Sequence, residues 1–232
     1  MPTTTPKSAF WTGFRDGLPF LLVLLPFGIL FGVTATEAGL NVVEAMMFTI
    51  VVIAGASQFS ALQLMTDHAP TLIVLATALA VNLRMAMYSA SLTPYLGQAN
   101  LWQRALISYF LVDATYACAI GRFEAHPQWQ LPARLGYFFG TVVAVCPAWY
   151  ALTLIGALIG EAIPGWLALD FAVPICFLAM IGPMLRTVAH LAAALTSVIL
   201  ALALAFIPYS MGLLIAALVA MMVGAYVETR TA

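Results

Sequence analysis

The chain has 232 residues, of which 64% are apolar and 7% are charged, whereas an ordinary soluble domain carries about 25% charged residues. Eight Lys or Arg and nine Asp or Glu are too few to cover a soluble surface of this size. The composition therefore excludes a free-standing soluble domain and favours an integral membrane protein. The formal net charge of −1 and the lack of clustered cations exclude a nucleic-acid-binding protein.

Apolar stretches long enough to cross a bilayer as helices follow one another along the chain. The first six are residues 17–36, 45–66, 70–92, 104–122, 135–160 and 168–188. A single helix over 187–227 would be about 60 Å long, so we expect it to fold back at Pro208 and form two spans. The sequence predicts an all-α polytopic bundle of about eight transmembrane helices, in a single transporter domain over residues 1–232.

The cations predict the orientation of this bundle in the membrane. Eight spans place six of them on one side: Lys7, Arg15, Arg122, Arg134, Arg186 and Arg230. Only Arg104 falls on the other side, so the positive-inside rule predicts that both termini are cytoplasmic. Seven spans would move Arg230 outside, which fits the rule less well.

Glycine pairs at helical spacing recur in the two halves of the chain, residues 1–125 and 126–232. Gly28-x-x-x-Gly32 has counterparts in Gly136-x-x-x-Gly140 and Gly156-x-x-x-Gly160. A duplicated four-helix unit is one interpretation, since transporters are often built from repeats. Close packing between helices is the other, and we favour it for these glycines.

The sequence contains no catalytic or metal-binding pattern of a known kind. The serines lack a matching set of His and Asp, HExxH is absent, and the three cysteines lack metal-ligand spacing. We therefore expect no enzyme, no cofactor and no metal, and favour a transporter because a few ionisable groups lie deep within apolar spans.

The middle of the second span holds Gly55-Ala56-Ser57-Gln58. Glycine followed by small polar residues favours an unwound or kinked helix, which a membrane tolerates where the backbone lines a cavity. The N–H groups of such a turn suit a substrate carboxylate, with Ser57 and Gln58 as further donors. The alternative is a helix contact in which Gln58 bonds to a neighbouring helix.

The third span contains Asn82 and Arg84, with Tyr88 one turn further along. An arginine inside a span is costly unless it pairs, faces water or reaches the interface. The i+4 spacing places Arg84 and Tyr88 on one helix face, which we expect to point into the bundle. Arg84 would there pair with Asp113 or with a substrate carboxylate.

Tyr109, Asp113 and Tyr116 share one face of the fourth span if that helix is continuous. Asp113 would then lie about 13 Å from Arg104 along the helix axis, close to the midplane. We favour a proton or amine site at Asp113 over a permanent ion pair. Asp170, at the start of the sixth span, is interpreted as a helix cap, with a proton-coupling role as the alternative.

At these residues the sequence resembles the AzlC-type branched-chain amino acid exporters, over about residues 10–228. The motifs that carry the resemblance are Gly13-Phe14-Arg15-Asp16-Gly17-Leu18-Pro19, Pro26-Phe27-Gly28, Gly55-Ala56-Ser57-Gln58-Phe59, Asn82-Leu83-Arg84, Ser91-Leu92, and Asp170-Phe171 with Pro174. The chain departs from the family at Met85, where histidine is common, and at Ala114, where an acidic residue is common.

The resemblance implies a large subunit that exports valine, leucine, isoleucine or similar apolar amino acids across a bacterial inner membrane. It implies proton coupling and a small membrane partner of the AzlD type. The expected substrate-binding residues are Gly55, Ala56, Ser57, Gln58, Asn82, Arg84, Tyr88, Asp113 and Tyr116, with Asp113 and Asp170 for proton coupling. The alternatives are a channel or carrier for another small solute, and a membrane assembly protein without transport activity.

Overall fold

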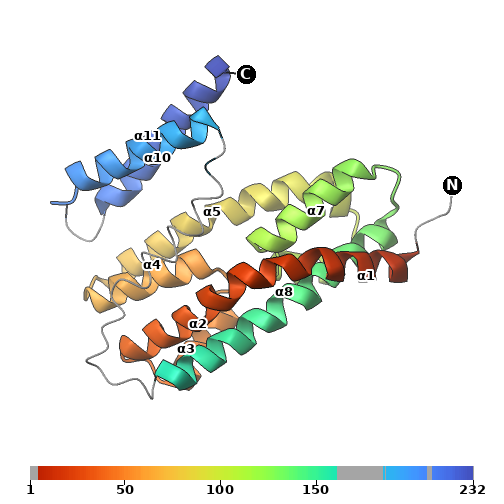
Figure 1. Cartoon of the computed structure of the whole chain (residues 1–232), viewed down its shortest axis with the longest axis horizontal. Coiled ribbons are helices and arrows are strands. Elements are labelled where there is room, and N and C mark those ends of the chain that lie inside the picture. Colours follow the sequence, from red (N-terminus) through yellow and green to blue (C-terminus); the bar gives the residue numbers. More distant parts are fainter. Residues whose placement is uncertain (1–4, 161–184, 186, 208–210, 232) are drawn as a thin grey trace. The chain divides into compact units, whose positions relative to one another are not determined.

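The computed structural model describes residues 5–160, 185, 187–207 and 211–231, and the regular structure within these ranges is helical throughout (Figure 1). The expected all-α membrane fold is thus confirmed. The described residues divide into two compact units, the first from 5–59 and 78–160 and the second from 60–77, 185, 187–207 and 211–231. Nearly all of the predicted sixth span, with Asp170, lies outside the described residues.

Helices follow one another with short connections along most of the described ranges. In chain order they are α1 (Pro6–Gly17), the short 3-10 helix η1 (Leu18–Phe20), α2 (Leu21–Glu37), α3 (Val42–Val51), α4 (Gly55–Thr66), α5 (Thr71–Leu96), α6 (Leu101–Tyr109), α7 (Asp113–Ala125), α8 (Leu131–Gly160), α10 (Val188–Ala203) and α11 (Met211–Thr231).

Within the described ranges, three helical segments are long and apolar enough to cross a membrane: Pro6–Glu37, Thr71–Leu96 and Leu131–Gly160. They correspond to the predicted first, third and fifth spans. The predicted second and fourth spans are each divided into two shorter helices, α3 with α4 and α6 with α7.

Helix α8 is the centre of the first unit, because α1, α2, α3 and α7 all pack against it. Paired glycines bring the backbones together. A Cβ atom on Gly140 would overlap the carbonyl oxygen of Phe10 in α1, and one on Gly156 would overlap that of Ile29 in α2. Close packing, the favoured interpretation of these glycine pairs, is therefore what the structure shows at both positions.

Helices α3 and α4 form a hairpin that turns back instead of crossing. In one continuous helix Phe59 would lie about 16 Å beyond Phe48. Both rings instead contact Phe31 of α2, with centroid distances of 5.8 Å for Phe48 and 5.4 Å for Phe59. The chain therefore reverses at 52–54, and the first turns of α4 run back along α2.

Helices α6 and α7 form a second hairpin of the same kind. Arg84 pairs with Asp113, Tyr88 stacks on Tyr116 and Tyr95 contacts Phe123, so α5 and α7 run in the same direction. Because α6 follows α5 after a connection of only four residues, it has to run back along the unit before α7 returns. The reversal lies at 110–112.

The two hairpins belong to an inverted repeat. Helix α2 runs parallel to α8 and α5 runs antiparallel to it, as the contacts of Gly32 with Thr153 and of Arg134 with Tyr95 show. Helix α2 is followed by the first hairpin and α5 by the second. Each hairpin begins at the end of the unit where the preceding long helix finishes. Both hairpins begin with an Asn capping box, at Asn41 and Asn100. Within the first unit this repeat relates residues 21–59 to residues 78–125, and it differs from the duplicated four-helix halves that the glycine pairs suggest.

The second hairpin also changes the position of Arg104. Arg134, at the start of α8, donates a 3.3 Å hydrogen bond to the carbonyl of Tyr95 near the end of α5. Helix α6 begins just after that end, so Arg104 lies at the same end of the unit as Arg122 and Arg134. The expectation that Arg104 lies on the opposite side is wrong, because the fourth predicted span turns back.

The second unit contains the packed pair α10 and α11. A Cβ atom on Gly224 of α11 would lie 3.1 Å from the Cβ atom of Ala193 in α10. Helix α10 ends at Ala203 and α11 begins at Met211. The predicted fold-back of 187–227 is thus confirmed, whereas its predicted position at Pro208 lies outside the described residues.

Candidate functional site

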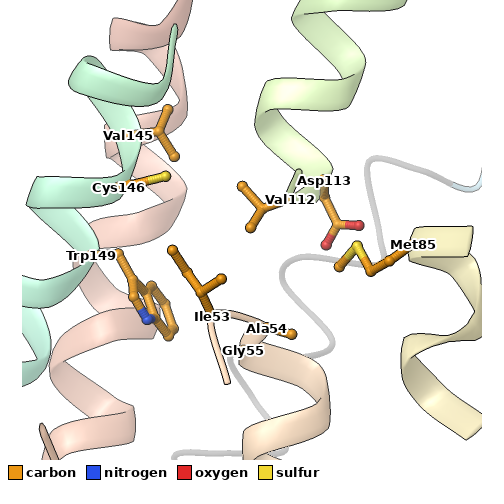
Figure 2. A pocket seen from close by; sticks show the side chains of 9 residues that line it. All are labelled: Ile53, Ala54, Gly55, Met85, Val112, Asp113, Val145, Cys146 and Trp149. Atoms are coloured by element: carbon orange, nitrogen blue, oxygen red, sulfur yellow. The ribbon is translucent and has the colours of Figure 1, made fainter. Parts of the chain in front are cut away.

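The tips of the two hairpins meet at a small cavity in the first unit (Figure 2). Its volume is about 70 Å³, and its lining residues come from both tips, α5 and α8: Ile53, Ala54, Gly55, Met85, Val112, Asp113, Val145, Cys146 and Trp149. Cys146 lies in the middle of the 30 residues of α8. The cavity therefore lies halfway along the longest helix of the unit.

The first tip is formed by residues 52–54, and α4 begins at Gly55. The expected break in the second span is confirmed, although it precedes Gly55 instead of following it. A Cβ atom on Gly55 would lie 2.8 Å from the ring of Phe27 and 3.1 Å from that of Trp149. Glycine thus lets the start of α4 approach this aromatic pair.

Tyr109, the last residue of α6, connects the two hairpins. Its hydroxyl donates a 2.6 Å hydrogen bond to the carbonyl of Ile50 in the last turn of α3, and lies 2.9 Å from the hydroxyl of Tyr150. A carbonyl in the last turn of a helix has no partner within the helix. Tyr109 therefore stabilises the first break from the second hairpin.

Ser57 and Gln58 lie in the first turns of α4 and are both fully buried. The Ser57 hydroxyl donates a 3.1 Å hydrogen bond to the carbonyl of Ala78 in α5, so the helix-contact interpretation applies to Ser57. Neither amide atom of Gln58 has a hydrogen-bond partner in the structure. The bond from Gln58 to a neighbouring helix, which was the alternative interpretation of this segment, is therefore not formed.

Arg84 and Asp113 form an ion pair between α5 and α7, with 3.1 Å between Nη1 and Oδ2. The hydroxyl of Tyr88 donates a 3.0 Å hydrogen bond to the other carboxylate oxygen. The Asp113 side chain is 54% exposed and that of Arg84 is 30% exposed. The pair is thus held by neighbours yet accessible, and Arg84 Nε has no partner of its own.

Tyr116 completes this cluster. Its ring stacks on that of Tyr88 with a centroid distance of 4.0 Å, and its hydroxyl donates a 3.1 Å hydrogen bond to Ser91 Oγ. The structure thus brings together four of the predicted site residues, Arg84, Tyr88, Asp113 and Tyr116. Asn82, half-buried in α5, has a side-chain oxygen without a partner.

The second tip lies at 110–112, so the expected continuous helix face of Tyr109, Asp113 and Tyr116 is not formed. Asp113 is instead the first residue of α7, where a carboxylate interacts favourably with the helix dipole. Thr115 closes this break: it accepts a 2.9 Å hydrogen bond from the N–H of Val112 and donates one of 2.9 Å to the carbonyl of Phe110. The helix therefore restarts with Asp113 at the cavity.

Sequence reasoning missed the α8 side of the cavity. Trp149 is buried there, and its indole N–H donates a 2.7 Å hydrogen bond to Thr49 Oγ1 in α3. Its ring stacks on Phe31. A signal existed, because Trp149 is the one tryptophan of five that lies well inside a predicted span, where an interfacial anchor is not expected.

The site contains no arrangement of metal ligands. Within the described ranges, no three His, Cys, Asp or Glu side chains are grouped so that they could hold a metal ion. What the site presents is an ion pair, two helix N-termini and apolar walls.

Comparison with known proteins places the chain in a family. The sequence model of the AzlC protein matches residues 19–163. This match covers both hairpins and the whole of α8.

The chain belongs to the AzlC family.

Two relatives match most of the length of this AzlC family chain. It is 28% identical over 188 residues to "Inner membrane protein YgaZ" of Escherichia coli, covering 78% of this chain and 75% of the relative. It is also 28% identical over 223 residues to an uncharacterised membrane protein of Archaeoglobus fulgidus, covering 94% and 95% respectively. No solved structure matches the chain.

Proposed function

We propose that this AzlC family protein exports branched-chain and similar apolar amino acids across the cytoplasmic membrane. The observation that supports the proposal most is the meeting of two broken helices at a cavity halfway along α8, beside the Arg84–Asp113 ion pair. Secondary transporters bind their substrates between discontinuous helices of inverted repeats. The family resemblance supplies the substrate class.

The groups around the cavity match the parts of an aliphatic amino acid. The start of α4, with Gly55 to Gln58, and the guanidinium of Arg84 suit the carboxylate. Asp113 suits the ammonium or a proton. Ile53, Met85 and Val112 provide apolar walls for the side chain. Gln58 lies three residues beyond Gly55 and has a buried amide without a partner, and we propose that the substrate carboxylate reaches it once the hairpin tips separate.

The volume of the cavity implies movement during transport. Sites for small molecules measure about 300–1,000 Å³, whereas this cavity measures about 70 Å³. Substrate entry therefore requires the hairpin tips to separate. The Arg84–Asp113 pair joins α5 to one of these hairpins, and we propose that it opens when the two charges of the substrate replace its internal partners.

Membrane location, orientation and coupling follow from the same proposal. The family relative in Escherichia coli is an inner membrane protein, and we propose the cytoplasmic membrane for this chain. The end of the first unit that carries Arg104, Arg122 and Arg134 would face the cytoplasm, as would both termini. Export would use the proton gradient through Asp113, with Asp170 as a second coupling residue. A small AzlD-type subunit would complete the exporter.

Efflux from proteoliposomes tests this function. Vesicles containing the chain, with and without the small subunit, are loaded with labelled valine, leucine, isoleucine or methionine, and a proton gradient is imposed or omitted. We expect saturable efflux that the gradient accelerates. If all four amino acids stay inside when the folded chain and its partner are both present, the proposal is wrong.

A further inference from the structure

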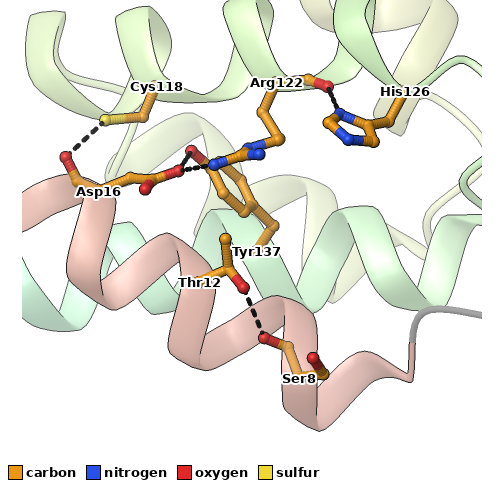
Figure 3. Close-up of polar contacts among 7 residues, drawn as sticks. All are labelled: Ser8, Thr12, Asp16, Cys118, Arg122, His126 and Tyr137. Carbon is orange, nitrogen blue, oxygen red and sulfur yellow. Dashed lines mark hydrogen bonds and ion pairs between the residues drawn. The ribbon is translucent and has the colours of Figure 1, made fainter.

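A second polar pocket lies between α1, α7 and α8 (Figure 3). Its volume is about 350 Å³, within the range of small-molecule sites. It is lined by Asp16, Cys118, Gly121, Arg122, Ala125 and Tyr137. Tyr137 precedes Cys146 by nine residues of α8, so the pocket lies about 13 Å from the central cavity along that helix, toward the end that carries the cations.

Three side chains converge in this pocket from three helices, as Figure 3 shows. Arg122 of α7 forms an ion pair with Asp16 of α1, and the Tyr137 hydroxyl of α8 donates a 2.7 Å hydrogen bond to the same carboxylate oxygen of Asp16. The Asp16 and Arg122 side chains remain 34% and 29% exposed. Both charges are therefore fixed in position and accessible from the pocket.

We infer that this pocket is a second binding site for a zwitterionic amino acid, through which the substrate passes on its way to the central cavity. The inference rests on the proposed export function. The carboxylate of the amino acid binds the Arg122 guanidinium. Its ammonium binds the Asp16 carboxylate, and its side chain occupies the space beside Gly121 and Ala125.

The charges of the site favour a zwitterion over an anion or a cation. A ligand with one charge would separate Asp16 from Arg122 and leave one of them without a partner, which is costly for a partly buried charge. A zwitterion replaces both partners at once. The residues on α7 also leave room for it, since a Cβ atom on Gly121 would meet no atom within 4 Å.

Cys118 supplies a direct probe, because it lines this pocket whereas Cys146 lines the central cavity. The full chain in lipid nanodiscs is treated with a small methanethiosulfonate reagent, and mass spectrometry measures the modification of each cysteine. We expect valine to slow the modification of Cys118, and isovalerate and isobutylamine, which each lack one charge, to leave it unchanged.

Two variants separate direct binding from an indirect effect. Asp113→Asn alters the central cavity and is expected to keep the protection of Cys118 by valine. Asp16→Asn removes the negative charge of the second site, so isovalerate is expected to protect Cys118 in that variant although it fails to do so in the wild type. This gain of protection does not follow from a purely structural ion pair.

A blocking substitution connects the pocket to transport. Gly121→Leu places a bulky side chain in the pocket at a position where an added Cβ atom meets no atom within 4 Å, and it is expected to raise the valine concentration needed for half-maximal efflux. Ala117→Leu on the same helix, outside the pocket lining, is the matched control. Wild-type efflux without protection of Cys118, or protection that disappears in Asp113→Asn, would overturn the second site alone. Absence of wild-type efflux would instead overturn the proposed function.

Discussion

Arg84 and Asp113 are ionisable residues that the apolar environment of their helices makes conspicuous in the sequence. The structure pairs them across α5 and α7 and adds the hydroxyl of Tyr88. Each of these two side chains helps to hold the other in place, and both remain partly exposed. A permanent ion pair and a transport site predict different results when the charges are changed.

Replacing Asp113 with asparagine removes the charge but keeps a hydrogen-bond acceptor for Tyr88. We expect Asp113→Asn to fold and to lose gradient-driven efflux by about tenfold or more, since a hydrogen bond to a charged group contributes about 1.5–3 kcal/mol. The measurement is valine efflux with and without a proton gradient. Asp67→Asn, at an exposed position, is the control. Normal gradient-driven efflux by Asp113→Asn would contradict a coupling role.

Exchanging the two charges tests the structural alternative. The double variant Arg84→Asp with Asp113→Arg keeps two opposite charges at these positions. It places a cation at the start of α7, where the helix dipole disfavours it, and exchanges the groups for carboxylate and ammonium. We expect folded protein without valine efflux. Recovery of wild-type efflux would show that the pair is only structural.

The sequence predicts this residue-level cluster well and its surroundings poorly. Charges inside apolar spans require partners, and helical spacing places Tyr88 beside Arg84, so the Arg84–Asp113 contact is expected. No sequence rule indicates that Tyr109 would reach Ile50, because that contact joins residues whose helices become neighbours only in the folded hairpins. The same reason hides the bond between Trp149 and Thr49.

At the scale of helices, the sequence indicates one of the two helix breaks but not the other. Gly55 and its small neighbours indicate the first. The second falls at Phe110-Leu111-Val112, an apolar run without glycine or proline. It is stabilised by the side chain of Thr115, and threonine inside a span is too common to indicate a break.

Gly55→Ala tests how closely the first hairpin tip has to fit. The added methyl group would press on the rings of Phe27 and Trp149, and overpacking of this kind costs about 1–3 kcal/mol. We expect a lower thermal unfolding temperature in detergent and slower valine efflux. Ser89→Thr, which adds one methyl group at an exposed position of α5, is the matched control. Equal behaviour of the two variants would show that the tip tolerates a larger residue.

At the scale of the whole molecule, the length of an apolar run predicts that a helix lies in the membrane but not the direction it takes. Residues 45–66 and 104–122 are long enough to cross, yet both runs reverse direction midway, at 52–54 and 110–112. Each hairpin therefore turns back toward the end from which it entered. The inverted repeat of residues 21–59 and 78–125 in the first unit follows from these reversals.

Surface labelling tests the topology of the first unit. The connections after α5 and before α8 lie at the same end, whereas a straight fourth span would place them on opposite sides. With a membrane-impermeant thiol reagent, Gln98→Cys and Gln128→Cys, both exposed, should react from the same side, and Glu44→Cys from the other. Reaction of Gln98→Cys and Gln128→Cys from opposite sides would contradict the re-entrant second hairpin.

Passage of the substrate between the two hairpin tips requires the tips to separate. Ile53 and Val112 both line the cavity. Each is replaced by cysteine in a chain whose own cysteines are replaced by alanine. A short cleavable bifunctional thiol reagent then joins the two introduced cysteines. The measurement is valine efflux before cross-linking, after it, and after reductive cleavage. We expect efflux to stop when the tips are joined and to resume when the link is cut. Undiminished efflux through the cross-linked protein would contradict passage between the tips.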